Sequence, residues 1–349
     1  MSSIAILAEG GFSEHDAKTA TGVLRYGSTP VVAVIDSTRA GTRVRDHIPG
    51  LDLDVPVVES IDQALALGAT ILLIGIAPAG GKLPDAWRVA ILRAIEAGLD
   101  VESGLHDFLG DDPELAAAAA RAGVEIRDLR RPPAGLDVPT GANLTVDAHV
   151  VATVGSDCAL GKMTVCLELD REAQRRGIPT GFVPTGQTGI AIAGWGIAVD
   201  EVVSDFVAGA SERLVVEGRK RAGPGALLWI EGQGSISHPA YSGVTLGLLH
   251  GSAPHSMILV HEPGRTHLDM PEGPPIPPLP QLIADYERMA AYVRPASVIA
   301  VSLKTNRLTD DDARASIAAT EAATGLPADD PVRYGAGKLL DAVMSAKSD

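Results

Sequence analysis

The chain has 349 residues, enough for two domains of ordinary size that each bury a core. A hydrophobic share of 46% with 21% charged residues is typical of a soluble globular protein, and no apolar run is long enough to predict a membrane span. A net charge of −15 without a basic stripe argues against nucleic-acid binding, and the presence of only 2 cysteines favours a reducing cytoplasm over a disulfide scaffold.

The first part of the chain alternates short apolar runs with helical patterns, which predicts a parallel sheet covered by helices. No basic segment precedes the first run, so we interpret it as a buried strand and not as an export signal. The predicted strands are 4–7, 31–36 and 70–75, and the predicted helices are about 84–98 and 112–123. The glycine-rich loops after these strands, at 9–11 and 77–81, do not form a dinucleotide fingerprint, so we expect no nicotinamide cofactor.

The run Arg-Arg-Pro-Pro-Ala-Gly at 130–135 interrupts this rhythm, so we expect the interdomain connection there and two domains, 1–145 and 146–349. The strands predicted for the second domain are 149–154, 180–184, 226–230, 257–260 and 297–301. Each is short and apolar on both faces, as strands buried between helix layers are. The proline-rich segment 271–280 cannot be a helix or a central strand, and we interpret it as a crossing loop.

The strand 149–154 leads into a loop with a glycine at each end, then a lysine and a helical pattern. The loop residues are Gly155, Ser156, Asp157, Cys158, Ala159, Leu160, Gly161, Lys162, Met163 and Thr164. The glycines let successive backbone N–H groups point inward, while the helix N-terminus and the Lys162 ammonium add positive charge. We therefore predict that this loop holds a pyrophosphate or several phosphates.

The loop departs from the usual P-loop pattern in two ways. Five residues separate its glycines, a spacing that resembles dethiobiotin synthetase, and Met163 stands where a hydroxyl normally binds the magnesium of a nucleoside triphosphate. A thioether is a poor ligand for a hard cation, so phosphate binding without phosphoryl transfer is the simpler interpretation, although Thr164 could substitute for the hydroxyl. The predicted fold class is α/β, with an N-terminal Rossmann-like parallel-sheet domain and a C-terminal P-loop NTPase-like domain.

Two further motifs follow predicted strands of the second domain. Thr185, Gln187 and Thr188 could donate hydrogen bonds to an acyl or carboxylate oxygen, although a tight turn also explains this segment. Glu231 could hold magnesium, accept an amine proton or orient a water. His238 is the alternative base, because neutral imidazole suits proton transfer near pH 7, and a loop histidine without a catalytic role is the plainer alternative.

Several charged residues are weaker candidates. Arg265 follows a strand and could bind a carboxylate or phosphate bidentately, and Arg25, Lys304 and Asn306 are similar candidates against ordinary surface roles. Asp205 and Glu212 share one face of the helix predicted at 203–212, which a solvated face explains equally well.

Metal binding and covalent catalysis are less well supported. The histidines clustered at 238–267 lack the spacing of zinc ligands, so we expect no metal. Cys158 stands at a helix N-terminus, where the dipole would lower the pKa of its thiol, so an acyl-enzyme is conceivable. A small residue filling the loop is the simpler interpretation.

Together these motifs resemble a bacterial family long labelled a domain of unknown function, whose characterised members are DgcN-type D-glutamate N-acetyltransferases. The resemblance is carried by 155–164, 185–189, 205–210, 231–234 and 238–241, and by 24–26, 34–37 and 75–78 in the N-terminal half. It implies transfer of an acetyl group from acetyl-CoA to the amine of D-glutamate or a related amino acid, giving N-acetyl-D-glutamate in D-amino-acid catabolism. The phosphates of coenzyme A could be held without magnesium, which agrees with Met163.

For this reaction we expect Glu231 or His238 as the base, and backbone N–H groups with Thr185, Gln187 or Thr188 as oxyanion donors. Arg265 and Arg25 would then bind the two carboxylates of the substrate. The expected partners are a small-molecule substrate and further copies of the chain in a homo-oligomer, with no nucleic acid and no membrane.

Two other functions stay open. An ATP-dependent ligase or small-molecule kinase of the dethiobiotin synthetase type would need Mg-ATP, with a metal site built from Thr164, Asp157 and Glu231 despite Met163. A nucleotide-dependent sensor or regulatory scaffold would bind its ligand without turnover.

Overall fold

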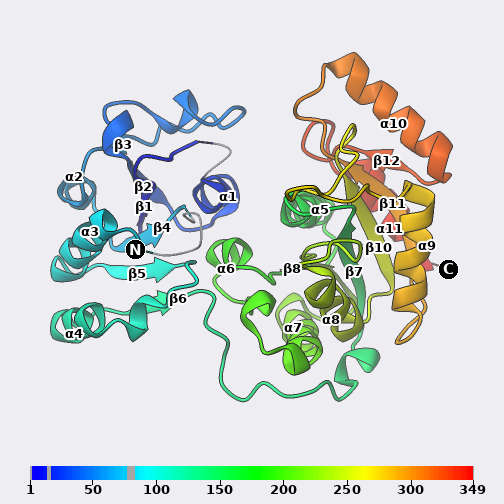
Figure 1. The fold of residues 1–349 in the computed structure, drawn as a ribbon, viewed down its shortest axis with the longest axis horizontal. Coiled ribbons are helices and arrows are strands. Elements are labelled where there is room, and N and C mark those ends of the chain that lie inside the picture. The colour runs from blue at the N-terminus through cyan, green and yellow to red at the C-terminus, as the bar shows by residue number, and fades with distance from the viewer. Residues whose placement is uncertain (1, 14–16, 77–82, 349) are drawn as a thin grey trace. The chain divides into compact units, whose positions relative to one another are not determined.

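The computed structural model describes residues 2–13, 17–76 and 83–348, which divide into two compact units (Figure 1). Unit 1 contains Met1–Arg131 and a later segment, Gln187–Ala198, while unit 2 contains Pro132–Gly186 and Val199–Asp349. The first boundary falls within the predicted connection at 130–135. The segment 187–198 differs from the predicted domain ranges because its helix, α6 (Gln187–Ala193), packs against α1 (Lys18–Tyr26) of unit 1.

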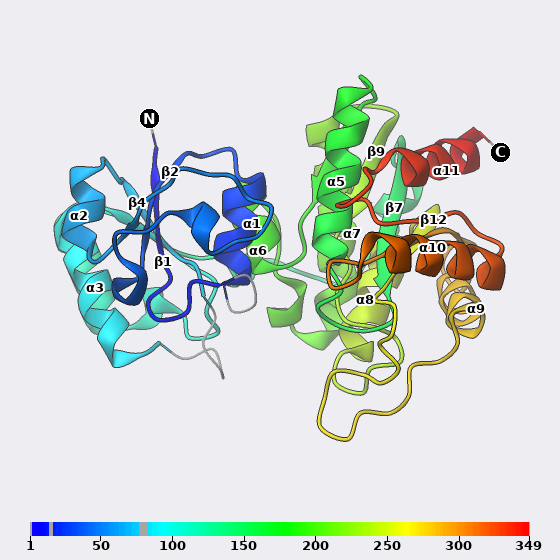
Figure 2. The same cartoon turned by 90° about the horizontal axis from the view of Figure 1, so that it is seen from above.

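Unit 1 is built on a six-stranded sheet in the order β3-β2-β1-β4-β5-β6, with all neighbouring strands parallel. Its strands are β1 (Ile4–Leu7), β2 (Val31–Ile35), β3 (Val57–Val58), β4 (Ile71–Ile74), β5 (Asp100–Ser103) and β6 (Ile126–Asp128). Its other helices are α2 (Ile61–Ala66), α3 (Asp85–Glu96) and α4 (Pro113–Ala122), with 3₁₀ turns at Ser37–Arg39, Val44–Asp46 and Leu109–Asp111. Helices α2 and α3 cover one face, while α1 and α6 cover the other (Figure 2).

The strand order of unit 1 is the one found in dinucleotide-binding domains. In those domains an acid beyond the second strand binds the ribose, but the equivalent Asp36 is fully buried and already bonded. Its carboxylate accepts hydrogen bonds from the N–H groups of Gly10, Phe12 and Thr38 at 3.2, 3.1 and 3.0 Å. Burial acts to raise the pKa of Asp36, but hydrogen bonds from the Thr38 hydroxyl, from the N–H groups of Phe12 and Gly10 and from the Arg39 guanidinium outweigh it and hold that pKa below its ordinary value. Asp36 therefore closes the loop after β1. The other glycine-rich loop, 77–81, lies outside the described residues.

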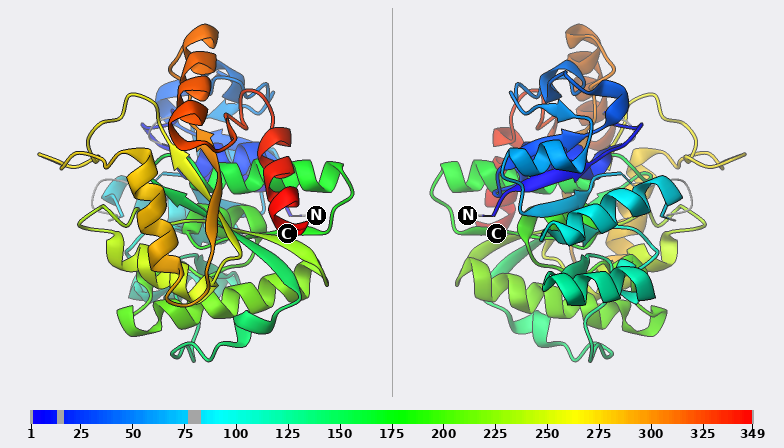
Figure 3. Two further views of the ribbon diagram at one scale, coloured as in Figure 1. Left: turned by 90° about the vertical axis from the view of Figure 1, so that its right-hand side faces the viewer. Right: turned by 90° about the vertical axis from the view of Figure 1, so that its left-hand side faces the viewer.

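Unit 2 contains a second six-stranded parallel sheet, in the order β12-β11-β10-β7-β9-β8. Its strands are β7 (Ala148–Gly155), β8 (Thr180–Val183), β9 (Ala226–Ile230), β10 (Ser256–His261), β11 (Ser297–Leu303) and β12 (Ala328–Asp329). Its helices are α5 (Lys162–Arg175), α7 (Val207–Ala222), α8 (Ser242–Ser252), α9 (Leu279–Ala290), α10 (Asp310–Thr324) and α11 (Gly337–Ser348), with 3₁₀ turns at Ala142–Thr145, Val199–Glu201 and Ser204–Phe206. Helices α5 and α11 cover one face of the sheet, and α7, α8 and α9 cover the other (Figure 3).

The order of this sheet reverses beside β7. The strands that follow β7 directly, β8 and β9, lie on one side of it, and β10, β11 and β12 lie on the other. A crevice forms at the carboxyl ends of the strands where the order reverses, and ligands of open α/β sheets bind there. The loop after β7 is the one for which the sequence predicted phosphate binding.

The structure confirms the predicted α/β class and corrects some details. The helix predicted at 203–212 is a 3₁₀ turn followed by α7, and Pro280 opens α9, where a missing backbone N–H costs no helical bond. Glu212 is buried, and its carboxylate accepts bonds from Thr140 N and Gly141 N at 2.8 and 2.6 Å, so it anchors the start of unit 2 and does not lie on a solvated face. Among the described residues, no helix is long and apolar enough to cross a membrane.

Helices α7 and α8 approach closely because glycine faces the contact. A Cβ on Gly251 would lie 2.1 Å from the carbonyl oxygen of Ala208. We expect Gly251→Ala to lower the free energy of unfolding by about 1–3 kcal/mol, because α8 must move away from α7. Urea denaturation measures the effect.

The matched control is Gly243→Ala in the same helix, where a Cβ meets nothing within 4 Å. This change should be neutral or stabilising by up to about 1 kcal/mol, since alanine is the better helix former. Equal effects of the two substitutions would contradict close packing at Gly251.

Candidate functional site

The loop between β7 and α5 needs glycine at both of its ends. Gly161 precedes α5 with a φ of +93°, in the left-handed region that favours glycine. At Gly155 a Cβ would lie 2.8 Å from Lys162 Nζ, so a side chain there would collide with the lysine. The strand, loop and helix predicted from the sequence are therefore present.

Lys162 folds back across the loop that it follows. Its side chain is buried, and Nζ donates a hydrogen bond of 2.8 Å to the carbonyl oxygen of Asp157. Gly232, after β9, leaves room for the side chain of Lys162, because a Cβ at this glycine would lie 2.9 Å from Lys162 Cδ. An ammonium group thus stands inside the loop at the N-terminus of α5, where the helix dipole also favours an anion.

Met163 does not replace the missing hydroxyl. Its side chain is buried with the apolar core of α5, whereas Thr164, one position further along the helix, is half-buried. The loop therefore offers a cation and backbone N–H groups, which are the groups that bind phosphate oxygens.

Asp157 is a carboxylate within this loop, fully buried and neutralised by Arg265. Its Oδ2 accepts hydrogen bonds from Arg265 Nη1 at 2.9 Å and from the N–H of Asp269 at 2.8 Å. Oδ1 accepts a bond from the N–H of Cys158 at 2.7 Å. A buried charge is costly unless it is paired, so this contact holds the loop after β10 against the phosphate loop.

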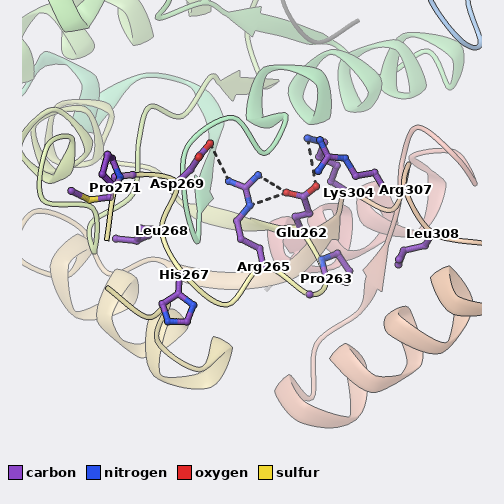
Figure 4. Close-up of a pocket in the computed structure, with 12 residues that line it drawn as sticks. Glu262, Pro263, Arg265, His267, Leu268, Asp269, Pro271, Lys304, Arg307 and Leu308 are labelled. Carbon is purple, nitrogen blue, oxygen red and sulfur yellow. Dashed lines mark hydrogen bonds and ion pairs between the residues drawn. The ribbon is translucent and has the colours of Figure 1, made fainter. Parts of the chain in front are cut away.

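Arg265 is occupied on two sides. Besides Asp157, it donates through Nε to Glu262 Oε2 at 2.8 Å, and Figure 4 shows its guanidinium between Glu262 and Asp269. Its role in the structure is to join the two loops. Binding of a substrate carboxylate by Arg265 stays a prediction.

Burial raises the thiol pKa of both cysteines. It raises the pKa of the half-buried Cys158 thiol to about 11, more than nearby Lys162 lowers it, and it raises the pKa of the buried Cys166 further. The expectation that the helix dipole lowers the pKa of Cys158 is therefore wrong, because desolvation of the thiolate outweighs the favourable charges. A protonated thiol is a weak nucleophile, which argues against an acyl-enzyme.

Glu231 lies at the end of β9 and is held in one orientation. Its carboxylate oxygen Oε2 accepts hydrogen bonds from the N–H groups of Thr185 and Gly186 at 2.9 and 3.2 Å, and the side chain is 5% exposed. The hydroxyl of Thr185 donates to the carbonyl oxygen of Glu231 at 2.6 Å and accepts from Gln233 Nε2 at 2.9 Å. Thr185 thus supports Glu231, and its hydroxyl is already used in both directions.

The other predicted substrate-binding residues belong to unit 1. Gln187 and Thr188 are in α6, where the Thr188 hydroxyl lies 2.9 Å from the hydroxyl of Thr19. Arg25 is in the last turn of α1, and its Nη2 donates to the carbonyl oxygen of Pro49 at 3.4 Å. Their part in substrate binding stays a prediction.

His238 is buried, with 3% of its surface exposed, and its bonding fixes the position of its proton. Nδ1 accepts a hydrogen bond of 3.2 Å from the N–H of Ala240. Since a backbone N–H can only donate, Nδ1 must present its lone pair, and the neutral ring carries its proton on Nε2. Within the described part of the chain, Nε2 is a buried nitrogen with no hydrogen-bond partner. In this tautomer the ring presents a donor at Nε2, and the role of His238 as a base stays a prediction.

Asp157, Cys158 and His238 also approach one another as a metal site would require, each with one ligand atom within 4.8 Å of the others. The bonding in the structure suits hydrogen bonds better than a cation. Asp157 already accepts three N–H groups, and a metal on Nε2 of His238 would need a proton on Nδ1, facing the N–H of Ala240. The absence of a resident metal remains an expectation.

Tyr286 of α9 is a site residue that sequence reasoning missed. Its buried hydroxyl donates to the carbonyl oxygen of Gly155 at 2.8 Å and accepts from the N–H of Ile236 at 3.2 Å, so it joins the loops after β7 and β9. His261 contributes similarly through Nδ1, 2.8 Å from the hydroxyl of Ser156, and burial lowers its pKa to about 4. Nothing near Tyr286 in the sequence signals this contact.

Both halves of the chain are similar to known proteins. A family model described as a domain of unknown function (DUF1611_C), a P-loop domain, matches residues 137–340, and one described as DUF1611_N, a Rossmann-like domain, matches 37–132. A D-glutamate N-acetyltransferase from Tritonibacter scottomollicae is 38% identical over 302 residues, covering 85% of this chain and 88% of that protein. Another from Pseudoalteromonas sp. is 34% identical over 284 residues, covering 80% and 83%. The crystal structure of a DUF1611 family protein from Anabaena variabilis has a TM-score of 0.92 at 43% identity, covering 99% of this chain and 100% of that one.

The raised pKa of Cys158 can be tested by alkylation. With a pKa of about 11, the thiol should react with iodoacetamide at pH 8 about two orders of magnitude more slowly than free cysteine, and faster as the pH rises. Intact-mass spectrometry follows the reaction, and Cys158→Ser identifies the modified residue. Fast labelling at neutral pH would contradict the pKa and would restore covalent catalysis as an option.

The hydroxyl of Tyr286 should stabilise unit 2 measurably. Tyr286→Phe leaves the buried carbonyl of Gly155 and the partly buried N–H of Ile236 without their partner, so we expect the free energy of unfolding to fall by about 1–3 kcal/mol. Chemical denaturation measures the change, with Tyr292→Phe as the control because that side chain is 76% exposed. A loss no larger than that of the control would show that the hydroxyl is dispensable.

Proposed function

This chain belongs to the DUF1611 family, and we propose that it is an N-acetyltransferase that moves the acetyl group of acetyl-CoA to the amine of D-glutamate. Two relatives that cover most of the chain, at 38% and 34% identity, bear the name D-glutamate N-acetyltransferase. The structural observation that supports the proposal best is a phosphate loop with a central ammonium and a buried methionine in place of the magnesium hydroxyl. The product would be N-acetyl-D-glutamate, an intermediate suited to D-amino-acid catabolism.

The loop suits coenzyme A because it offers charge and N–H groups without a metal ligand. The pyrophosphate of CoA needs only donors and a positive charge, which Lys162 and the N-terminus of α5 supply. Phosphoryl transfer from ATP would instead need magnesium to neutralise charge at the transferred group. Met163 removes the hydroxyl that normally holds that metal, so metal-free binding is favoured.

Acetyl transfer requires a base for the amine. The ammonium form of glutamate cannot attack a thioester, so a proton must leave before the nitrogen bonds to the acetyl carbon. Glu231 is the better candidate for the base. Two backbone N–H groups orient its carboxylate, and an ionised carboxylate can accept the proton of the amine. When the tetrahedral intermediate collapses, the carbon–sulfur bond breaks. Of the two protons that the nitrogen loses, one passes to the CoA thiolate and the other is released to solvent by Glu231.

The acetyl oxygen becomes negative in this intermediate and needs a donor. His238 presents Nε2–H, a buried donor without a partner among the described residues, held in that tautomer by the N–H of Ala240. A buried unpaired donor carries a cost of about 1–3 kcal/mol that a bound acceptor relieves. His238 therefore stabilises the oxyanion in the proposed mechanism, with backbone N–H groups as further donors.

The proposal is tested by release of CoA thiol from acetyl-CoA in the presence of D-glutamate or L-glutamate, with EDTA throughout. Release that depends on D-glutamate and is unchanged by EDTA is expected, together with N-acetylglutamate identified by mass spectrometry. A parallel assay supplies Mg-ATP and measures ADP. ADP formation without CoA release would move the protein to the ligase or kinase class, and tight binding without turnover in either assay would indicate a regulatory scaffold.

Glu231→Gln should separate the base from the cofactor site. We expect kcat to fall by about 10²–10⁴-fold, because the amide cannot accept the proton, while CoA affinity stays within a factor of two or so. Glu217→Gln, at a surface position of α7, is the matched control and should leave kcat unchanged. An active Glu231→Gln enzyme would exclude this carboxylate as the base.

Lys162→Ala should instead weaken acetyl-CoA binding, seen as a higher KM.

A further inference from the structure

A pocket of about 690 Å³ lies in unit 2 beside the phosphate loop (Figure 4). One wall is the segment 262–271, which follows β10, and the other is the segment 304–308, which follows β11. The volume is within the range of small-molecule sites, about 300–1,000 Å³, and is generous for a single amino acid. The pocket is therefore of a size for a nucleotide.

The pocket and the phosphate loop share a boundary. Arg265 Nη1 donates to the carbonyl oxygen of Cys158 at 3.3 Å, and Lys304 Nζ donates to the carbonyl oxygen of Ala159 at 3.4 Å. Both contacted residues belong to the phosphate loop, and both donors line the pocket. A ligand whose pyrophosphate occupies the loop can thus extend into the pocket.

The pocket lining combines three cations, two carboxylates and apolar side chains. The carboxylates, Glu262 and Asp269, are paired with Arg265. Lys304 lies 3.8 Å from Glu262 Oε1, while Arg307 has no ion pair or hydrogen bond to any described residue. Figure 4 shows these two cations at one side of the pocket. Leu268, Met270 and Leu308 give the lining apolar surface. Arg307 is exposed, so its guanidinium is accessible to an anionic ligand in the pocket.

We propose that this pocket binds the 3′-phosphorylated adenosine end of coenzyme A, with the phosphate on Arg307 and Lys304 and the base on the apolar wall. The inference rests on the proposed function and specifies how the co-substrate is recognised. The 3′-phosphate is what distinguishes CoA from dephospho-CoA and from ATP, so Arg307 would make the enzyme selective for CoA. Charge-assisted bonds from a guanidinium to phosphate have the strength that such selectivity needs.

The experiment measures binding of CoA and dephospho-CoA to the full-length protein by calorimetry, without an acetyl acceptor. The unsubstituted protein should bind CoA about tenfold or more tightly than dephospho-CoA. Arg307→Ala should reduce this ratio to about two or less while leaving the affinity for dephospho-CoA unchanged, and Arg307→Lys should retain part of it. Arg288→Ala, at an exposed position of α9, is the charge-matched control and should keep the full ratio.

Two results would overturn the inference while leaving the proposed function intact. One is equal binding of CoA and dephospho-CoA by the unsubstituted protein, and the other is a loss in Arg307→Ala that affects both ligands equally. A second variant, Lys304→Gln, gives the same test from the neighbouring cation. Failure of the proposed function is distinguishable, because neither form of CoA would then bind while Mg-ATP would.

Discussion

The ion pair between Asp157 and Arg265 is the contact on which the loops at the carboxyl ends of the unit 2 strands depend. An acid inside a phosphate loop would repel its ligand, and a fully buried carboxylate is unstable without a partner. Arg265 solves both problems, and with the N–H of Asp269 it joins the loop after β7 to the loop after β10. The phosphate loop and the pocket beside it are consequently one structure, so a change at either partner should disturb both.

Local sequence was enough to predict the phosphate loop, because the glycines, Lys162 and the flanking strand and helix are neighbours in the chain. The same signal could not reveal what surrounds the loop. Arg265 is 108 residues from Asp157, and Tyr286 is 131 residues from the glycine that its hydroxyl contacts. Such pairs become neighbours only when the sheet is assembled, so local sequence does not predict them. The pKa of Cys158 was predicted in the wrong direction for a related reason: the helix dipole can be read from the sequence, whereas burial cannot.

Unit 1 illustrates how a fold differs from a function. Its strand order is that of dinucleotide-binding domains. The alternating apolar runs predicted a parallel α/β sheet and three of its strands, β1, β2 and β4, but not the order of the strands or the short strands β3, β5 and β6. Yet the carboxylate of Asp36, at the position that would receive a ribose, is bonded to N–H groups of the loop after β1 and to Thr38 and Arg39 of its own loop. A scaffold can keep its topology after its ligand chemistry has been replaced by internal bonds.

Segment 187–198 belongs to unit 1 although it lies within the sequence of unit 2, and this affects the order in which unit 1 is made on the ribosome. Helix α6, which covers α1 in unit 1, is encoded after β8 of unit 2. Domains of most proteins fold as their residues leave the ribosome, from the N-terminus onward. Here the first 131 residues are synthesised before α6, which packs against α1, and β7, α5 and β8 are made in between. Unit 1 can therefore be complete only after residue 198 has been translated.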